Sequence, residues 1–154
     1  MFASRKSQGT INNDGERKTE MERRDKMYTE LESELNQIFT ELGMEPNENR
    51  AFMWLKELIM IAVRSPAVWS DSYLEDIGKR ENLTRERVRQ LLWRTAAEKW
   101  NFSKGCEVLC NHFGDSVEIN FTIKSKPSAE EFVTLLADNL RAKYQIQPHR
   151  KRLR

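Results

Sequence analysis

The segment from Thr84 to Arg94 gathers the side chains of this chain that are best suited to recognising nucleic-acid bases. It runs TRERVRQLLWR and mixes arginine, glutamate and glutamine. Arginine is a two-pronged donor to guanine, glutamine pairs with adenine, and glutamate accepts a hydrogen bond from cytosine. A stripe of lysines alone would not offer this chemistry. The candidate base-reading residues are Glu86, Arg89, Gln90 and Trp93.

These four residues share one face of the segment if it is helical. At about 100° per residue, apolar and small residues fall on the other face, which would pack on a core. Those core-facing residues are Val88, Leu91, Leu92, Thr95 and Ala96. Charged residues are also common on ordinary solvent-exposed helix faces, so the pattern alone leaves that interpretation open. The residues that precede the segment favour a base-reading helix over an ordinary solvent-exposed one.

A short helix is predicted immediately upstream. Ser72 and Glu75 have the spacing of a capping box, which predicts a helix that ends at about Arg80. Ile77 is followed by Gly78, where the first helix of a helix-turn-helix needs a small residue because the second helix packs closest there.

A tight turn and a second helix follow. Asn82 can adopt the left-handed conformation that such a turn needs, and Thr84 can cap a helix that reaches Lys99 or Trp100. We therefore predict a helix-turn-helix between Ser72 and Trp100. The candidate phosphate-contacting residues around it are Lys79, Arg80, Thr84, Arg85, Arg87 and Arg94.

Apolar periodicity predicts two helices before this motif. Leucine and isoleucine recur at three- and four-residue steps from Tyr28 to Leu42, and Gly43 ends the pattern. The stripe lasts about two heptads, which is short for a coiled coil and favours a helix that faces the core. The segment from Phe52 to Val63 is apolar on nearly all sides, as expected of a central helix.

The C-terminal part predicts two more helices. A short one covers Lys104 to His112, and a last one begins with the capping sequence Pro127 to Glu131. Its buried face would consist of Phe132, Leu135, Leu136 and Leu140. Between these helices, Val117 to Ile123 alternates apolar and polar residues, which indicates an isolated strand or an extended connector.

Together these elements predict an all-α fold, a compact bundle of about six helices that contains the helix-turn-helix. A length of 154 residues suits one domain, which we place at residues 26–145. Residues 1–25 have almost no bulky apolar side chain and are predicted to form a disordered arm. Residues 146–154 form a basic tail that ends in HRKRLR.

Overall charge does not identify a partner, because 26 basic residues nearly balance 24 acidic ones. Only the local distribution of charge along the chain can indicate a nucleic-acid partner. No apolar run approaches the roughly 20 residues of a membrane span, and the N-terminus has no apolar signal-peptide core. We expect a cytoplasmic protein without membrane contact.

Metal binding and catalysis are the less favoured alternatives. Cys106, Cys110 and His112 could suggest zinc, but a structural site needs four ligands and the other histidine, His149, lies in the basic tail. We expect two free cysteines, no metal and no cofactor. Acidic residues such as Asp115 and the Glu130–Glu131 pair have no accompanying nucleophile motif or phosphate loop, so we expect no enzyme activity.

The residues described above resemble two families. The segments EDIGKR and NLTRERVRQ are similar to the promoter-reading helix-turn-helix of bacterial primary sigma factors. A longer likeness, from about Leu31 to Tyr144, is to the DNA-binding effector domain of the stage-zero sporulation protein A family, which governs endospore formation. The segments ELGMEPNENRAFMWLKELI and KSKPSAEEFVTLLADNLR flank the helix-turn-helix in the same order and carry this resemblance.

The resemblance implies particular roles. The family's two principal base-reading positions fall on Arg89 and Gln90, where sporulation regulators have glutamate and arginine, so the preferred DNA site should differ. Arg87 matches a basic residue of the family, whereas Trp93 replaces a basic phosphate-contacting one and could touch a thymine methyl group or a neighbouring protomer. The family also implies tandem binding on adjacent sites.

Family members carry a phosphorylatable receiver domain before this domain. The roughly 30 residues ahead of the first predicted helix are too few to fold into one, so we expect no phosphorelay control in this chain. The expected function is sequence-specific binding of double-stranded DNA by a transcription regulator. The alternative is a protein-interaction module that engages RNA polymerase or a sigma factor, because fold alone does not decide function.

Overall fold

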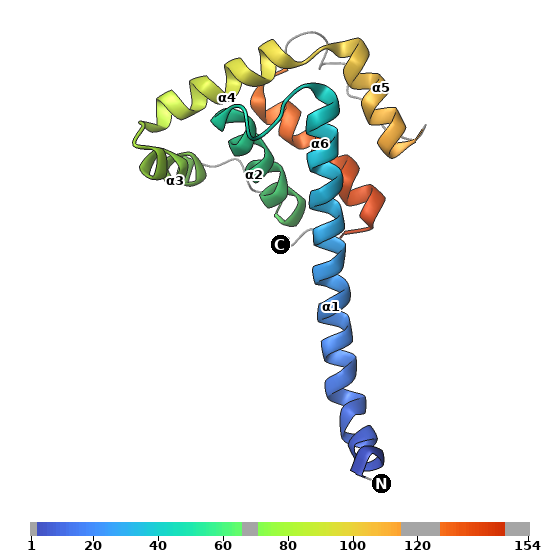
Figure 1. The fold of residues 1–154 in the computed structure, drawn as a ribbon. Coiled ribbons are helices and arrows are strands. Elements are labelled where there is room, and N and C mark those ends of the chain that lie inside the picture. The colour runs from blue at the N-terminus through green and yellow to red at the C-terminus, as the bar shows by residue number, and fades with distance from the viewer. Residues whose placement is uncertain (1–2, 66–70, 115–126, 147–154) are drawn as a thin grey trace, which may run out of the picture. The chain divides into compact units, whose positions relative to one another are not determined.

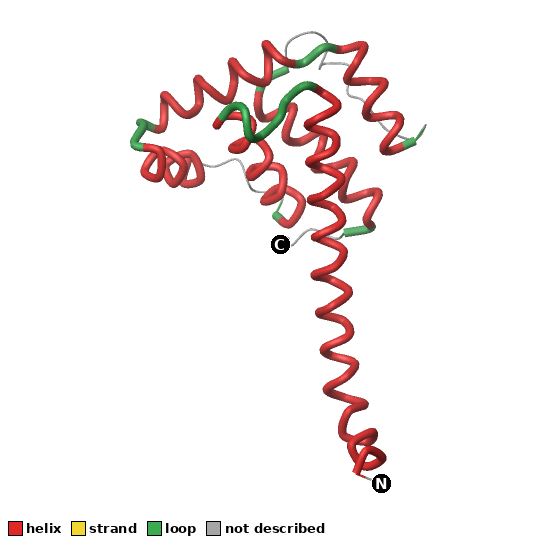
Figure 2. The backbone as a smooth tube through the Cα atoms, viewed as in Figure 1, coloured by secondary structure: helices red, strands yellow, loops and turns green. Residues whose placement is uncertain are grey.

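The computed structural model describes residues 3–65, 71–114 and 127–146, and all regular structure within these ranges is helical (Figures 1 and 2). The prediction of an all-α fold with about six helices is confirmed. The helices are α1 (Ala3–Leu42), α2 (Arg50–Arg64), α3 (Asp71–Glu81), α4 (Arg85–Lys99), α5 (Phe102–Phe113) and α6 (Ala129–Tyr144). The chain divides into one unit that ends at Ser33 and a second that begins at Glu34.

In the first unit, α1 begins well before the apolar pattern predicts a helix. The pattern starts at Tyr28, whereas the helical path starts at Ala3. Side chains from Thr19 to Lys26 are exposed, so this stretch has no buried face. A helix without a buried face gains little stability from packing, and the same shortage of bulky apolar side chains is the reason that the sequence predicts a disordered arm at residues 1–25.

The core of the second unit has an aromatic centre. The rings of Phe39 and Phe132 meet edge to face with centroids 6.0 Å apart, and Trp100 meets Phe132 at the same distance. Edge-to-face pairs of this kind stabilise a fold by about 0.5–1.5 kcal/mol beyond the burial of their area. These three residues connect α1, α6 and the end of α4.

Helix α2 is the central helix that the sequence predicts. It packs against both α6 and α4, and most of its apolar side chains are buried. The buried set is Ala51, Phe52, Trp54, Leu55, Leu58, Ile59, Ala62 and Val63. Arg141 of α6 also donates a hydrogen bond of 2.5 Å to the carbonyl oxygen of Ala62, near the end of α2. One of the carbonyl groups that a helix end leaves unpaired is thereby satisfied.

Several predicted helix ends are confirmed. Gly43 follows α1 with a φ of 82°, a left-handed conformation that glycine adopts without a steric penalty. Ser128 and Glu131 form the predicted capping box at the start of α6, with both reciprocal hydrogen bonds at 3.0 Å. The predicted helix Lys104–His112 is α5, which is slightly longer and is capped by Asn101.

The predicted capping box at Ser72 is wrong. Helix α3 begins at Asp71, so Ser72 lies inside the helix, whereas a capping residue must lie outside it. A four-residue motif locates a helix end only to within a residue or two, and the burial of Leu74 and Ile77 is compatible with the earlier start.

Some predictions fall outside the described residues. These are the extended segment Val117–Ile123, the residue Asp115, and residues 147–154 of the basic tail with His149. Among the helices of the described ranges, none has both the length and the apolar character that a membrane crossing requires.

Candidate nucleic-acid interface

The turn between α3 and α4 brings two stretches of backbone into direct contact (Figure 1). Leu83 donates a backbone hydrogen bond of 2.8 Å to the carbonyl oxygen of Gly78. A Cβ atom added at Gly78 would lie 2.5 Å from the carbonyl oxygen of Leu83, closer than real Cβ atoms approach. Asn82 has a φ of 62°, the predicted left-handed conformation. The predicted glycine and turn residues therefore have the roles that a helix-turn-helix requires.

Helix α4 begins as the sequence predicts. The hydroxyl oxygen of Thr84 accepts a hydrogen bond of 3.1 Å from the backbone N–H of Arg87, which caps the helix. Of the predicted core-facing residues of α4, Val88, Leu92 and Ala96 are buried, and Leu91 and Thr95 are half-buried. The helix thus packs one face on α2 and α6 and leaves the other face to solvent.

The candidate base-reading residues lie on or beside this outer face. Glu86, Gln90 and Trp93 are exposed, and Trp93 keeps 53% of its surface accessible. Arg89 is half-buried, with 39% of its side chain accessible. It therefore lies at the flank of the face rather than at its centre.

Two contacts connect side chains along the outer face of α4. Nη1 of Arg89 lies 2.5 Å from a carboxylate oxygen of Glu86, which is an ion pair one helical turn apart. Arg87 donates a longer hydrogen bond of 3.4 Å to the amide oxygen of Gln90. One contact thus joins two candidate readers, Glu86 and Arg89, and the other joins the reader Gln90 to Arg87, a candidate phosphate-contacting residue.

The candidate phosphate-contacting residues fall into two groups. Arg80 and Arg85 are held in ion pairs, Arg80 with Glu57 at 2.9 Å and Arg85 with Glu75 at 3.2 Å. The hydrogen bond to Glu57 raises the pKa of Arg80 above its already high ordinary value, against the opposing effect of burial.

The second group consists of Lys79, Arg87 and Arg94, which are exposed. Within the described ranges, Lys79 and Arg94 form no ion pair with an acidic residue. These three residues supply the positive charge beside α4 that is not offset by an adjacent carboxylate. Thr84 is also exposed, and its hydroxyl oxygen is used as the helix cap.

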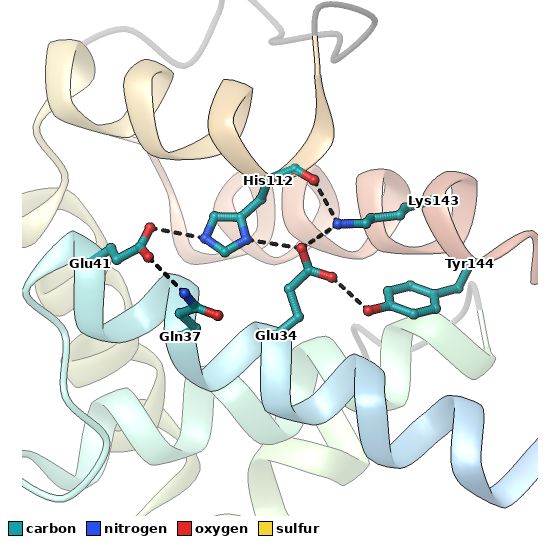
Figure 3. A network of polar contacts seen from close by, with 6 residues as sticks. All are labelled: Glu34, Gln37, Glu41, His112, Lys143 and Tyr144. Atoms are coloured by element: carbon teal, nitrogen blue, oxygen red, sulfur yellow. Dashed lines mark hydrogen bonds and ion pairs between the residues drawn. The ribbon is translucent and has the colours of Figure 1, made fainter.

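A polar cluster away from this face was not predicted (Figure 3). His112 of α5 lies between two carboxylates of α1, with Nδ1 2.9 Å from Glu34 and Nε2 2.9 Å from Glu41. Ionised carboxylates only accept hydrogen bonds, so both contacts are hydrogen bonds when both ring nitrogens carry protons. Gln37 donates to the other carboxylate oxygen of Glu41 at 3.2 Å.

Glu34 is the centre of this cluster. It accepts hydrogen bonds from Lys143 at 2.5 Å and from the Tyr144 hydroxyl at 2.6 Å, both on α6. Burial alone raises the pKa of Glu34, but the hydrogen bonds from Lys143, Tyr144 and His112 outweigh burial and leave the pKa below its ordinary value. Lys143 also donates to the backbone carbonyl of His112 at 2.8 Å. The cluster therefore joins α1, α5 and α6.

The only signal of this cluster in the sequence is the polar stripe of Glu34, Gln37 and Glu41 along α1. Their partner His112 lies 71 and 78 residues away from the two carboxylates, and no local pattern links such positions. The cluster is built from charged groups that satisfy one another at the packing of three helices.

The candidate zinc ligands are not arranged as a metal site. Cys106 is half-buried and Cys110 exposed, both are free thiols, and the ring of His112 already faces two carboxylates. Burial, and to a lesser degree the neighbouring Cys110, raises the pKa of Cys106, which disfavours the thiolate that a metal needs. In the part of the chain that the structure describes, no group of three or more histidine, cysteine or acidic side chains is arranged so that it could hold a metal ion.

Comparison with known proteins assigns no family. No protein-family model matches the chain, and no solved structure is significantly similar to it.

Proposed function

We propose that this chain is a transcription regulator that binds double-stranded DNA sequence-specifically, with α4 as the recognition helix in the major groove. The observation that carries the proposal is the close approach of Gly78 to the backbone of Leu83. That approach, with the left-handed turn at Asn82, holds a capped helix whose outer face is polar. The major groove of B-form DNA is wide enough to admit such a helix.

The side chains on and around α4 are suited to two kinds of DNA contact, with bases and with phosphates. Glu86, Arg89, Gln90 and Trp93 are on or beside the outer face, where they would meet base edges. Basic residues around the motif would meet phosphates, which position the helix without carrying sequence information. Lys79, Arg87 and Arg94 are the best placed, because Arg80 and Arg85 are already paired with acidic residues.

The resemblance to the sporulation regulators is part of this proposal. Its three segments coincide with the end of α1 and α2, with α3 and α4, and with α6. We therefore propose a monomer in free solution that binds adjacent DNA sites in tandem, and a cytoplasmic location. Because Arg89 and Gln90 replace the glutamate and arginine of that family, the preferred site should differ from the site of the sporulation regulators.

One observation favours a second candidate function. Trp93, Met53 and Phe102 are large apolar side chains with 53%, 41% and 36% of their surface exposed. Exposed aromatic residues are common at the centres of protein interfaces. A module that docks on RNA polymerase or a sigma factor would depend on such residues rather than on Arg89 and Gln90.

Selection from a pool of random duplexes tests the proposal. Wild-type protein should enrich a defined site, and Arg89→Ala and Gln90→Ala should each relax the preference at a different base pair. Each two-pronged contact contributes on the order of 1–3 kcal/mol of discrimination. Arg94→Ala should weaken binding to all duplexes about equally, because it removes a phosphate contact.

The matched control is Lys104→Ala, which removes an exposed basic residue from α5, outside the helix-turn-helix. It should leave both the selected site and the affinity unchanged. Selection that enriches no site would contradict the proposal, and so would base preferences that persist in both Arg89→Ala and Gln90→Ala. Binding to RNA polymerase or a sigma factor that depends on Trp93 would then favour the docking module.

A further inference from the structure

Four charged side chains join the end of α3 to α2. Arg80 of α3 lies 2.9 Å from Glu57 of α2 through Nη2, and 3.6 Å from its neighbour Glu81 through Nε. Glu81 in turn lies 2.9 Å from Nη1 of Arg50, the first residue of α2. The two basic and two acidic residues therefore form one continuous set of ion pairs without net charge, which we call the α2–α3 network.

The network joins two helices that have little other contact with each other. Within the described ranges, α3 packs chiefly against α4, whereas α2 packs against α4 and α6. Most side chains of α2 are apolar and buried, and Glu57 is the one acidic residue of this helix. The contact with Arg80 accounts for a carboxylate in the middle of a helix that otherwise belongs to the core.

The two residues of α2 in the network lie on the same side of that helix. Arg50 and Glu57 are seven residues apart, which is two helical turns and about 10 Å along the axis. Contacts at two such points fix both the distance of α3 from α2 and its direction. Because α3 and α4 meet closely at Gly78 and Leu83, the orientation of α3 also affects how α4 is presented.

The environment of Glu81 makes the network more than a set of isolated surface pairs. A single exposed ion pair contributes little to stability, but a network of several charges contributes more. Glu81, which contacts both arginines, keeps only 19% of its side chain accessible, so salt screens it less than a fully exposed group. Interactions of this strength change the population of one orientation by several-fold, which is measurable as a change in DNA affinity.

A phosphate contact is the other role open to Arg80, and it is the role that the sequence predicts. The guanidinium, however, faces two carboxylates, which occupy donors and offset its charge. Its neighbour Lys79 is exposed and forms no ion pair with an acidic residue of the described ranges. The structure thus distinguishes two adjacent basic residues of α3, of which Arg80 is directed to α2.

We propose that Arg80 is a positioning residue of the helix-turn-helix, which acts through the α2–α3 network to hold α3 and α4 in the orientation that meets DNA. This inference rests on the proposed function and reassigns Arg80 from phosphate contact to positioning. The network contributes to affinity for the selected site by favouring one orientation. It releases no counterion from the phosphates, because Arg80 does not contact them.

The first test compares Arg80→Ala with Lys79→Ala in fluorescence anisotropy titrations on the duplex that the wild-type protein selects. Arg80→Ala should weaken binding by roughly 2- to 30-fold but leave the salt slope unchanged. Lys79→Ala should reduce the salt slope by about 0.9, because it removes a phosphate contact. Circular dichroism and urea unfolding establish that both variants are folded, so that affinities are compared between folded proteins.

A second variant, Glu57→Gln, disrupts the network without adding negative charge. If Arg80 positions the motif, Glu57→Gln should weaken binding to the selected duplex, and it should cause little further loss in an Arg80→Ala background. If Arg80 contacts a phosphate, Glu57→Gln should instead strengthen binding to every duplex, because it removes a carboxylate that competes for the guanidinium. The control Glu107→Gln changes an exposed acidic residue of α5 and should leave binding unchanged.

The failures of this inference and of the proposed function are distinguishable. Wild-type protein that selects no duplex would contradict the proposed function and this inference with it. Where a duplex is selected, a salt slope that falls by about 0.9 in Arg80→Ala would overturn this inference alone, and so would a gain of affinity in Glu57→Gln. Unchanged affinity of both variants would overturn it too, because the network would then have no effect on the orientation that meets DNA.

Discussion

Gly78 and Leu83 are in contact through their backbones, and a Cβ atom at Gly78 would lie 2.5 Å from the carbonyl oxygen of Leu83. The atom that blocks the way belongs to backbone and cannot swing aside as a side chain could. The angle between α3 and α4 therefore depends on the absence of a side chain at this one position.

Gly78→Ala should destabilise the protein by about 1–3 kcal/mol, the usual cost of forcing extra volume into a packed site. Without the clash, the same replacement of glycine by alanine inside a helix would stabilise the protein by about 1 kcal/mol. The direction of the change in stability therefore distinguishes the two cases. Urea unfolding followed by circular dichroism measures the difference. A gain in stability would contradict the close approach.

Thr84→Ala should lower the free energy of unfolding by about 0.5–2 kcal/mol, because the backbone N–H of Arg87 loses its acceptor. Thr84→Ser keeps the hydroxyl and should restore most of this stability. The comparison also separates the cap from a phosphate contact, since a loss of DNA affinity without a loss of stability would point to the phosphate. Equal stability of the alanine and serine variants would contradict the cap.

Glu34→Gln should destabilise the protein by about 1–3 kcal/mol at neutral pH, because Lys143 and His112 lose a charged acceptor. The pKa of Glu34 is lowered in the folded protein, so its contribution is fully present above the ordinary pKa of 4.5. It is lost as the pH falls through the lower pKa of the folded state.

The stabilities of wild type and Glu34→Gln should therefore converge below about pH 4.5. Urea unfolding at several pH values checks this. The control Glu107→Gln changes an exposed acidic residue of α5 and should follow the wild type throughout. If the difference in the free energy of unfolding between wild type and Glu34→Gln stayed constant with pH, the charge of the Glu34 carboxylate would not be the source of the stabilisation.

The salt dependence of DNA binding should be moderate. Lys79, Arg87 and Arg94 are the candidate residues not offset by a carboxylate, so the logarithm of the binding constant should fall with the logarithm of salt with a slope of about −3. Replacing any one of them by alanine should reduce the slope by about 0.9. A slope near zero in fluorescence anisotropy titrations would exclude phosphate contacts by these residues.

The turn and caps around α4 are features that the sequence predicts well. Asn82 has a positive φ, Thr84 caps the helix and Gly78 lies at the closest approach, as the local pattern indicates. These features depend on residues within about five positions of one another, so backbone sterics and short-range hydrogen bonds decide them. The capping box at Ser72 shows the limit of such motifs, because the helix begins one residue earlier.

The exposure of individual side chains on α4 is less predictable. Periodicity put Arg89 and Gln90 on the same outer face, whereas Gln90 is exposed and Arg89 is half-buried at the flank. Helical periodicity gives the direction in which a side chain points from the axis of its helix. How far the neighbouring helices extend around that axis depends on the packing of the whole core.

The amino-acid sequence by itself determined the helices of the second unit, the turn between α3 and α4, and most of the residues of α4 that face the core, because each depends on local chain geometry and apolar periodicity. Only the tertiary structure decided which charges are paired. Arg80 meets Glu57 across 23 residues and His112 meets Glu34 across 78. Charged side chains are attracted to any opposite charge within reach, and the packing of the helices brings these particular groups together.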